Sequence, residues 1–260
     1  MSGRARPWLV AVVSFVSSLS SWSPHSRSVL EGRSSVSGEQ RSVEDLLGRL
    51  EELVARVAPR RAVLGIAGPP GSGKTTLVTR LLTAVAAYPG LSGRVAHVPM
   101  DGFHLTNASL DALGRRERKG APDTFNALAY AGVLASVRSL PRAVVLSPSF
   151  DHVVGEPVPA SLVVPVDADL VVTEGNYLLL GSGDWVGLPA MLDEVWWCAL
   201  DGDVRVERLV TRHVETGREV ADATEWVLRS DEANAQAVHG GAERADVVLL
   251  DGVVVSESDR

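Results

Sequence analysis

Short apolar runs of strand length alternate along most of the chain with longer segments of helical periodicity. The apolar runs cover residues 62–67, 94–100, 143–147, 169–173, 194–200 and 246–250. Apolar residues also recur every three to four positions, which predicts helices at 76–85, 126–140, 203–216 and 220–238. A similar stripe predicts a helix from Ser42 to near Pro59. Strands that alternate with helices predict an α/β fold, in which a mainly parallel sheet is covered on both faces.

The first 40 residues do not share this pattern. Twelve of residues 1–38 are serine, and no helical or strand period persists there. Arg4 and Arg6 precede an apolar run at 8–13, as in a signal peptide, but that run is far shorter than the ~20 residues of a membrane span. We predict that residues 1–40 are a disordered or mis-assigned extension, that residues 41–260 form one domain, and that no segment crosses a membrane.

Charge and cysteine content narrow the class of protein further. The net charge is −7; residues 1–38 carry four arginines and one glutamate, +3 in all, so the remaining chain carries −10. An acidic domain argues against a nucleic-acid partner. The single cysteine, Cys198, lies in the apolar run at 194–200, which predicts a buried thiol rather than a disulfide. We expect a cytoplasmic protein.

Residues 68–75 form a glycine-rich motif between a predicted strand and a predicted helix. They read Gly-Pro-Pro-Gly-Ser-Gly-Lys-Thr and fit G-x-x-x-x-G-K-[ST], the P-loop. In a P-loop the backbone wraps a polyphosphate, the lysine lies between its β- and γ-phosphates, and the hydroxyl ligates Mg²⁺. The motif therefore predicts ATP and Mg²⁺ as cofactors. The predicted loop ligands are Gly68, Gly71, Ser72, Gly73, Lys74, Thr75 and Thr76.

Two acidic residues follow predicted strands. Asp101 comes after the run at 94–100, and Glu174 comes after the run at 169–173. Ligands of parallel α/β sheets bind at the carboxyl ends of the strands, so both acids are expected beside the P-loop. We predict that Glu174 holds Mg²⁺ together with Thr75 and that Asp101 is the base that accepts a proton from a substrate hydroxyl. The structural alternatives are that Glu174 only ends a strand and that Asp101 starts an ordinary turn.

The remaining candidates are cations and loop residues. Lysine and arginine together number 25, but apart from the P-loop lysine only Lys119 is a lysine; we predict a catalytic ammonium there, with an exposed surface cation as the alternative. Arg208 and Arg212 lie four residues apart on a predicted helix. We predict a lid that presents them to the nucleotide and the transferred phosphoryl group, with ion pairs to neighbouring glutamates as the alternative. Predicted substrate contacts from loops are His104, Asp151 and His152.

Five short blocks of sequence resemble those of one family of P-loop kinases. They lie, in order, at 68–76, 100–104, 118–125, 148–152 and 173–177. Residues 60–250 thereby resemble the uridine kinase, phosphoribulokinase and type I pantothenate kinase family, in particular its bacterial nucleoside/nucleotide kinase-like branch. The resemblance implies a three-layer P-loop NTPase sandwich with a small helical lid. It also implies that Asp101 is the base, that Lys119 approaches the phosphates, and that Arg208 and Arg212 are lid arginines.

Three functions compete at this point. The leading one is an ATP-dependent kinase for a hydroxyl of a small metabolite, such as a nucleoside, a sugar or a pantothenate-like compound. A nucleoside monophosphate kinase is the second, because Gly-Pro-Pro-Gly-Ser-Gly-Lys resembles adenylate kinase loops, although those continue Lys-Gly-Thr. A regulatory P-loop ATPase switch is the third. The predicted partner is the small-molecule hydroxyl substrate, with neither nucleic acid nor membrane, and a homodimer is compatible with this prediction.

Overall fold

The computed structural model describes residues 46–251 and 253–258. The extension predicted over 1–40 and the first residues of the helix predicted from Ser42 lie outside these ranges. Six strands form one sheet in the order β2–β5–β1–β6–β7–β8, in which every pair is parallel except β7 with β8. These strands are β1 (Ala62–Ala67), β2 (Val95–Pro99), β5 (Leu170–Gly175), β6 (Glu194–Ala199), β7 (Val247–Leu250) and β8 (Val253–Glu257). The predicted mainly parallel sheet is confirmed.

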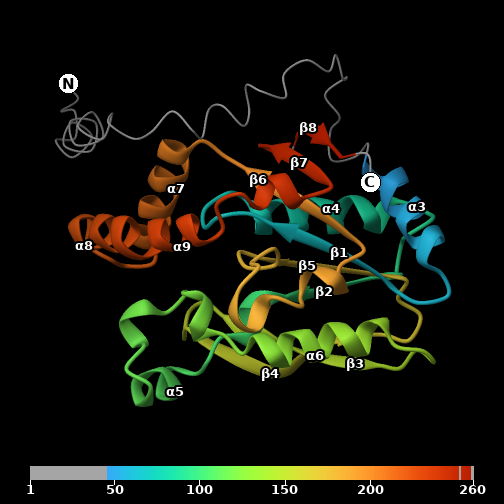
Figure 1. Ribbon diagram of the computed structural model, residues 1–260, viewed down its shortest axis with the longest axis horizontal. Coiled ribbons are helices and arrows are strands. Elements are labelled where there is room, and N and C mark those ends of the chain that lie inside the picture. Colours follow the sequence, from blue (N-terminus) through green and yellow to red (C-terminus); the bar gives the residue numbers. More distant parts are fainter. Residues whose placement is uncertain (1–45, 252, 259–260) are drawn as a thin grey trace, which may run out of the picture. The chain divides into compact units, whose positions relative to one another are not determined.

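Helices cover both faces of this sheet, as the alternating pattern predicts (Figure 1). On one face, α3 (Leu47–Val57) and α4 (Lys74–Ala87) pack their leucines against β1 and β5. On the other face, α6 (Ala127–Arg138) buries one side of its surface against the same two strands. Cys198, Trp196 and Trp197 of β6 are buried, as predicted for core residues. Because β1 is central and buried on both faces, the P-loop that follows it starts from a rigid support.

A strand is present near residues 143–147, as predicted, but it does not join the main sheet. It is β3 (Val145–Asp151), and it pairs antiparallel with β4 (Glu156–Val164) in a separate two-stranded sheet. Most residues of β4 are exposed, and only its last three residues, 162–164, form a continuous apolar run, so this strand was not predicted. The segment from 103 to 126, in which the sequence pattern predicts neither a strand nor a helix, contains the short helix α5 (Asn107–Ala112) and 3₁₀ turns at Arg116–Arg118 and Pro122–Thr124.

The carboxyl-terminal helices form the predicted lid. The first is α7 (Gly202–Glu215), whose N-cap Asp201 accepts hydrogen bonds from the backbone N–H groups of Asp203 and Val204. The predicted helix at 220–238 is three pieces: α8 (Val220–Trp226), a π-helical turn (Val227–Asp231) and α9 (Glu232–Ala237). Within the described ranges, no helix combines the length and the apolar character that crossing a bilayer requires.

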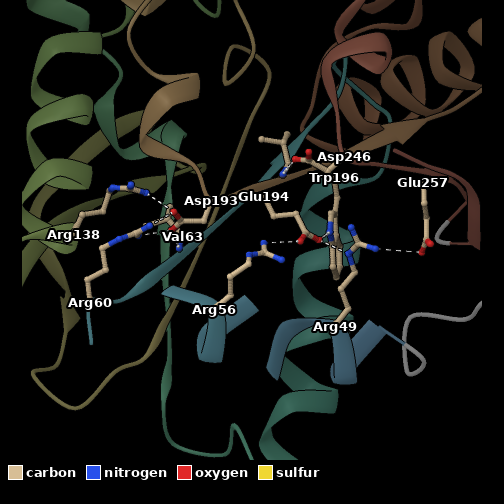
Figure 2. A network of polar contacts seen from close by, with 11 residues as sticks. Arg49, Arg56, Arg60, Val63, Arg138, Asp193, Glu194, Trp196, Asp246 and Glu257 are labelled. Atoms are coloured by element: carbon tan, nitrogen blue, oxygen red, sulfur yellow. Dashed lines mark hydrogen bonds and ion pairs between the residues drawn. The ribbon is translucent and has the colours of Figure 1, made fainter. Parts of the chain in front are cut away.

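Ion pairs hold together the edge of the sheet at which the parallel strands begin, which we call the amino edge (Figure 2). Asp193 precedes β6, accepts from the backbone N–H of Val63 at 2.9 Å, and pairs with Arg60 and Arg138 at 2.6 and 2.9 Å. The buried Glu194 pairs with Arg49 of α3 at 2.5 Å and accepts from the indole N–H of Trp196 at 2.6 Å. Each acid here is matched by arginines from neighbouring elements, so these charges fix the position of the helices on the sheet.

Candidate active site

A pocket of about 410 Å³ lies over the P-loop. Its walls come from the loop and the start of α4, from the ends of β6 and β7, and from the lid helix α7. The predicted ligands among its lining residues are Gly71, Ser72, Gly73, Lys74, Thr75, Thr76, Arg208 and Arg212. The structure therefore brings the P-loop and both lid arginines to one cavity, whose volume lies within the ~300–1,000 Å³ usual for small-molecule sites.

Lys74 joins this pocket to the two predicted carboxylates. Its ammonium donates to the backbone carbonyl of Pro69 at 2.9 Å and lies within electrostatic range of Glu174 and Asp101. The two acids also interact electrostatically with each other. In the parallel register Glu174 pairs with Ile66 of β1 and with Pro99 of β2, so the three strand ends meet at one edge, which we call the carboxyl edge.

Close backbone packing makes this meeting possible. A Cβ atom added at Gly175 would lie 2.5 Å from the Cβ of Met100, which no side chain tolerates. The glycine therefore lets the end of β5 approach the 3₁₀ turn Met100–Phe103 that carries Asp101. The repeated acid-glycine pairs of the sequence, Asp101-Gly102 and Glu174-Gly175, thus combine a carboxylate predicted to be functional with a residue that permits close contact.

The buried charges of the carboxyl edge have shifted pKa values. Burial raises the pKa of Glu174 to about 7; Asp101 adds to this rise, and Lys74 opposes it. Burial also lowers the pKa of Lys74, with a further contribution from Arg212, while Glu174 and Asp101 oppose the change. In the part of the chain that the structure describes, neither Glu174 nor Asp101 forms a side-chain hydrogen bond or a salt bridge. A buried carboxylate without such a partner is costly, which is typical of functional sites.

These residues fit a magnesium ion held jointly with a nucleotide. Kinase Mg²⁺ is usually bound by one or two protein oxygen ligands, phosphate oxygens and water rather than by a full protein cage. Consistent with that, the described residues contain no cluster of three or more His, Cys, Asp or Glu side chains that could hold a metal alone. Glu174 would gain a compensating charge, and Thr75, in the first turn of α4, lines the pocket over the P-loop.

His104 lies directly beside Asp101. Its Nδ1–H donates to the backbone carbonyl of Asp101 at 2.8 Å, and its ring stacks between Phe125 and Phe150, with centroids 3.9 and 4.6 Å away. Burial lowers the pKa of His104, so the imidazole is neutral at neutral pH. The histidine therefore supports the turn that carries the predicted base, and one ring nitrogen is already committed to that turn.

Lys119 is placed away from the nucleotide pocket. Its ammonium donates to the side-chain oxygen of Asn107 at 2.6 Å and to the backbone carbonyl of Gly155, and it lies 5.3 Å from the ring centroid of Phe150. It does not line the pocket over the P-loop. In this arrangement Lys119 joins α5 to the β3–β4 hairpin, and its approach to the phosphates stays a prediction.

The last two predicted substrate contacts lie at the tip of the hairpin. Asp151 uses Oδ1 to accept from the backbone N–H groups of Val153 and Val154, at 2.8 and 3.0 Å, so it caps the turn. His152 is exposed, with its ring 5.1 Å from that of Phe150. The structure does not place either residue among the groups around Lys74, and their contact with substrate stays a prediction.

Three residues at the pocket or behind the P-loop were not predicted from the sequence. Arg80 and Asp251 line the pocket, and Asp251 forms an ion pair with Arg208 at 3.5 Å. Arg205 of α7 lies behind the P-loop. Asp251 had a detectable signal, because it follows a predicted strand and precedes a glycine, as Asp101 does. Arg205 also had one, since it lies three residues before Arg208 on the same helix.

A mainly parallel sheet with a P-loop after β1, acids at the ends of β5 and β2, and two arginines on a lid helix is the arrangement of a P-loop kinase. The comparisons with known proteins agree. The family model described as "Phosphoribulokinase / Uridine kinase family" matches residues 63–256. The chain belongs to that family.

Individual relatives span most of the chain. It is 31% identical to a candidate uridine kinase of Schizosaccharomyces pombe over 80% of this chain and 90% of that protein. It is 33% identical to the uncharacterized protein YggC of Escherichia coli over 78% of this chain and 84% of that protein. Among solved structures, a candidate fructose transport system kinase from Silicibacter is 30% identical, with a TM-score of 0.66 over 79% of this chain and 95% of that one. The names of the first and third of these proteins contain the word kinase and connect them with different compounds, uridine and fructose, whereas the name of YggC states no activity.

Proposed function

We propose that this protein uses ATP and Mg²⁺ to phosphorylate a hydroxyl group of a small metabolite. The observation that carries the proposal is the Asp101 carboxylate, which lies in the turn after β2, interacts electrostatically with Glu174 and Lys74, and forms no side-chain hydrogen bond among the described residues. Lys74 itself lines the pocket over the P-loop. A carboxylate without a hydrogen-bond partner at this place has the geometry and the lone pairs of a general base.

The reaction follows from the placement of these groups. The acceptor hydroxyl gives its proton to Asp101 while its oxygen forms a bond to the γ-phosphorus. The bond from that phosphorus to the β,γ-bridging oxygen breaks, and ADP leaves. Lys74, Arg208 and Arg212, which line one pocket, stabilise the charge on the phosphoryl oxygens. Mg²⁺ held near Thr75 and Glu174 would neutralise further phosphate charge.

The acceptor is a small molecule with a free hydroxyl, and the relatives suggest where to begin. Uridine and fructose occur in the names of the relatives above, and pantothenate in that of a Nocardioides kinase that is 35% identical over 50% of this chain and 39% of that protein. The first panel consists of these three compounds, further pentoses and hexoses, and a glycerate-like acid. The measurement is ADP release with each compound. Nucleoside monophosphates belong in the same panel, because their phosphorylation would favour a different acceptor group.

Asp101→Asn tests the proposed role of the base. The substitution keeps the shape and removes the negative charge, so single-turnover transfer should fall by roughly 10²–10⁴. ATP affinity should persist, because the P-loop and Lys74 are unchanged. Transfer within a few-fold of the wild type would remove Asp101 from the mechanism. Loss of ATP binding together with transfer would instead assign Asp101 a structural or metal-binding role.

A further inference from the structure

Arg205 differs from the two other arginines named on α7. Arg208 and Arg212 are exposed and line the pocket, whereas Arg205 is only 5% exposed. One arm of its guanidinium, Nη1, donates to the backbone carbonyl of Pro70 at 3.3 Å. The other arm, Nη2, donates to the carboxylate of Glu232 at the start of α9. A buried guanidinium that donates both to a loop carbonyl and to a helix far away in the sequence keeps the loop and the helix at a fixed distance.

The backbone of α7 lies directly against the P-loop. Gly71 has a φ of +78°, and a Cβ atom added there would lie 2.8 Å from Cγ of Leu209 and 3.0 Å from Cγ of Arg205. Only glycine fits this position, both because of its backbone conformation and because the helix occupies the space of a side chain. The lid helix and the phosphate-binding loop therefore share a tight contact in which Arg205 is the charged member.

The carbonyl that Arg205 holds belongs to an unusual pair. Pro69 and Pro70 have no N–H group to offer a phosphate, and their carbonyl oxygens carry partial negative charge. The Pro69 oxygen accepts from the Lys74 ammonium at 2.9 Å and from the Ser72 N–H at 3.2 Å. The Pro70 oxygen accepts from Arg205. Both carbonyls are thus engaged by cations, which keeps their negative ends from turning toward a bound polyphosphate.

The same guanidinium is tied into the rest of the lid. Next to its partner Glu232, Asp231 accepts from Nε2 of His213 at 3.2 Å, so two side-chain contacts join α7 to the segment at 231–232. Arg208 and Arg212 follow Arg205 by three and seven residues on one continuous helix. Because the helix is continuous, the contact that Arg205 makes with the P-loop also fixes the distance of Arg208 and Arg212 from that loop.

We infer that Arg205 is a positioning residue that couples the lid to the P-loop. It holds the Pro70 carbonyl away from the phosphates and sets Arg208 and Arg212 in register with the loop, so ATP affinity depends on it although it does not line the pocket. This inference rests on the proposed use of ATP.

The chain contains a matched control for the test. Arg138 on α6 also donates to one backbone carbonyl, that of Met191 at 2.8 Å, and to one carboxylate, that of Asp193 at 2.9 Å. It lies at the amino edge, away from the nucleotide pocket. Arg205→Lys keeps the charge but loses the planar fork, so a lysine cannot reach both of the acceptors that Nη1 and Nη2 hold. Arg138→Lys makes the same substitution at a site where Nη1 alone makes both contacts. Arg205→Met and Arg138→Met remove the contacts altogether.

The measurement is the dissociation constant of ATP by equilibrium binding, alongside the urea-unfolding midpoint of every variant. We expect Arg205→Lys to weaken ATP binding by ~10-fold, the effect of losing one charge-assisted hydrogen bond, and Arg138→Lys to change it less than twofold. Both lysine variants should lose stability. Arg205→Met should weaken ATP binding more than Arg205→Lys.

Two results would count against different claims. If Arg205→Lys binds ATP as tightly as Arg138→Lys does, Arg205 only supports the fold and the inference is wrong. If the wild-type protein does not bind ATP, the proposed function fails first. Should Arg205→Met not fold, the comparison of the two lysine variants decides the question alone.

Discussion

The amino edge and the carboxyl edge of the parallel sheet both carry buried carboxylates, but only those of the amino edge are paired. Asp193 at the amino edge meets two arginines and a backbone N–H. Although burial would raise the pKa of Asp193, these partners, chiefly Arg60, outweigh burial and hold it below its usual value. At the carboxyl edge the effect of burial is larger than the opposing effect of Lys74, and the pKa of Glu174 rises to about 7.

This difference in pairing distinguishes an acid that stabilises the fold from an acid that is predicted to bind a ligand. A buried acid with its partners in place stabilises the arrangement of helices and strands and has no free lone pair aimed at a ligand. A buried acid without a partner costs stability until a ligand supplies the missing charge. The amino edge therefore holds helices and strands together, whereas the unpaired acids of the carboxyl edge are available to a nucleotide and its metal ion.

Replacement of Lys74 should have the largest effect. Lys74→Met removes the cation between the β- and γ-phosphates, so turnover should fall by at least ~10³, as for other fixed charges in phosphoryl transfer. Single-turnover transfer and ATP affinity measure this. The other lysine is the control: Lys119→Met should leave the ATP dissociation constant unchanged, because Lys119 contacts α5 and the hairpin. Equal loss of ATP binding in both variants would place Lys119 at the nucleotide.

Asp193→Asn tests the amino edge. It leaves Arg60 and Arg138 without their charged partner, so the free energy of unfolding should fall by about 2–3 kcal/mol at pH 7, while kcat stays within twofold. Because the folded-state pKa of Asp193 lies below the usual 3.8, its contribution is present above that pH and is lost as the pH falls below it. Urea unfolding at pH 7 and at low pH measures this. A large loss of kcat with little loss of stability would break the comparison.

Glu174→Gln should have the opposite effect on stability. Between pH 4.5, the usual pKa, and about 7, the folded protein holds a proton that the unfolded chain has released, so stability falls as the pH rises. Without nucleotide, the variant should therefore be more stable than the wild type at pH 8, by about 1–2 kcal/mol, and the gain should vanish near pH 4.5.

The same variant should lose Mg²⁺-dependent turnover. Thermal unfolding at both pH values, with and without Mg²⁺ and ATP, separates the two effects. A glutamine variant that is less stable at pH 8 would show that Glu174 already has a favourable partner. Normal turnover with normal Mg²⁺ dependence would remove it from the metal site.

Asp151→Ala should have the smallest effect. Asp151 caps the hairpin turn through Val153 and Val154, so its loss should cost about 1 kcal/mol or less and change the KM of the acceptor by less than ~3-fold. Steady-state kinetics with the identified acceptor test this. A KM increase of tenfold or more would restore Asp151 as a substrate contact and extend the carboxyl-edge site to the hairpin.

The sequence by itself determined the parts of this protein that depend on local pattern. The P-loop needs contiguous residues, and β1 is predicted to the residue because a run buried on both faces is apolar throughout. The positions of Asp101 and Glu174 at strand ends follow from the same runs. The pairing of β3 with β4 could not be predicted in this way, because β4 is mostly exposed and only its last three residues, 162–164, form an apolar run.

Only the tertiary structure decided which charges are paired. Asp193 and Glu174 are both acids next to apolar runs, Asp193 before one run and Glu174 after another. Whether each is paired depends on arginines that come from distant elements. Arg205 and Arg208 likewise look alike on one helix, yet one reaches the P-loop backbone and the other lines the pocket. Pairing between distant residues depends on how helices pack on the sheet, and no local pattern of residues encodes that.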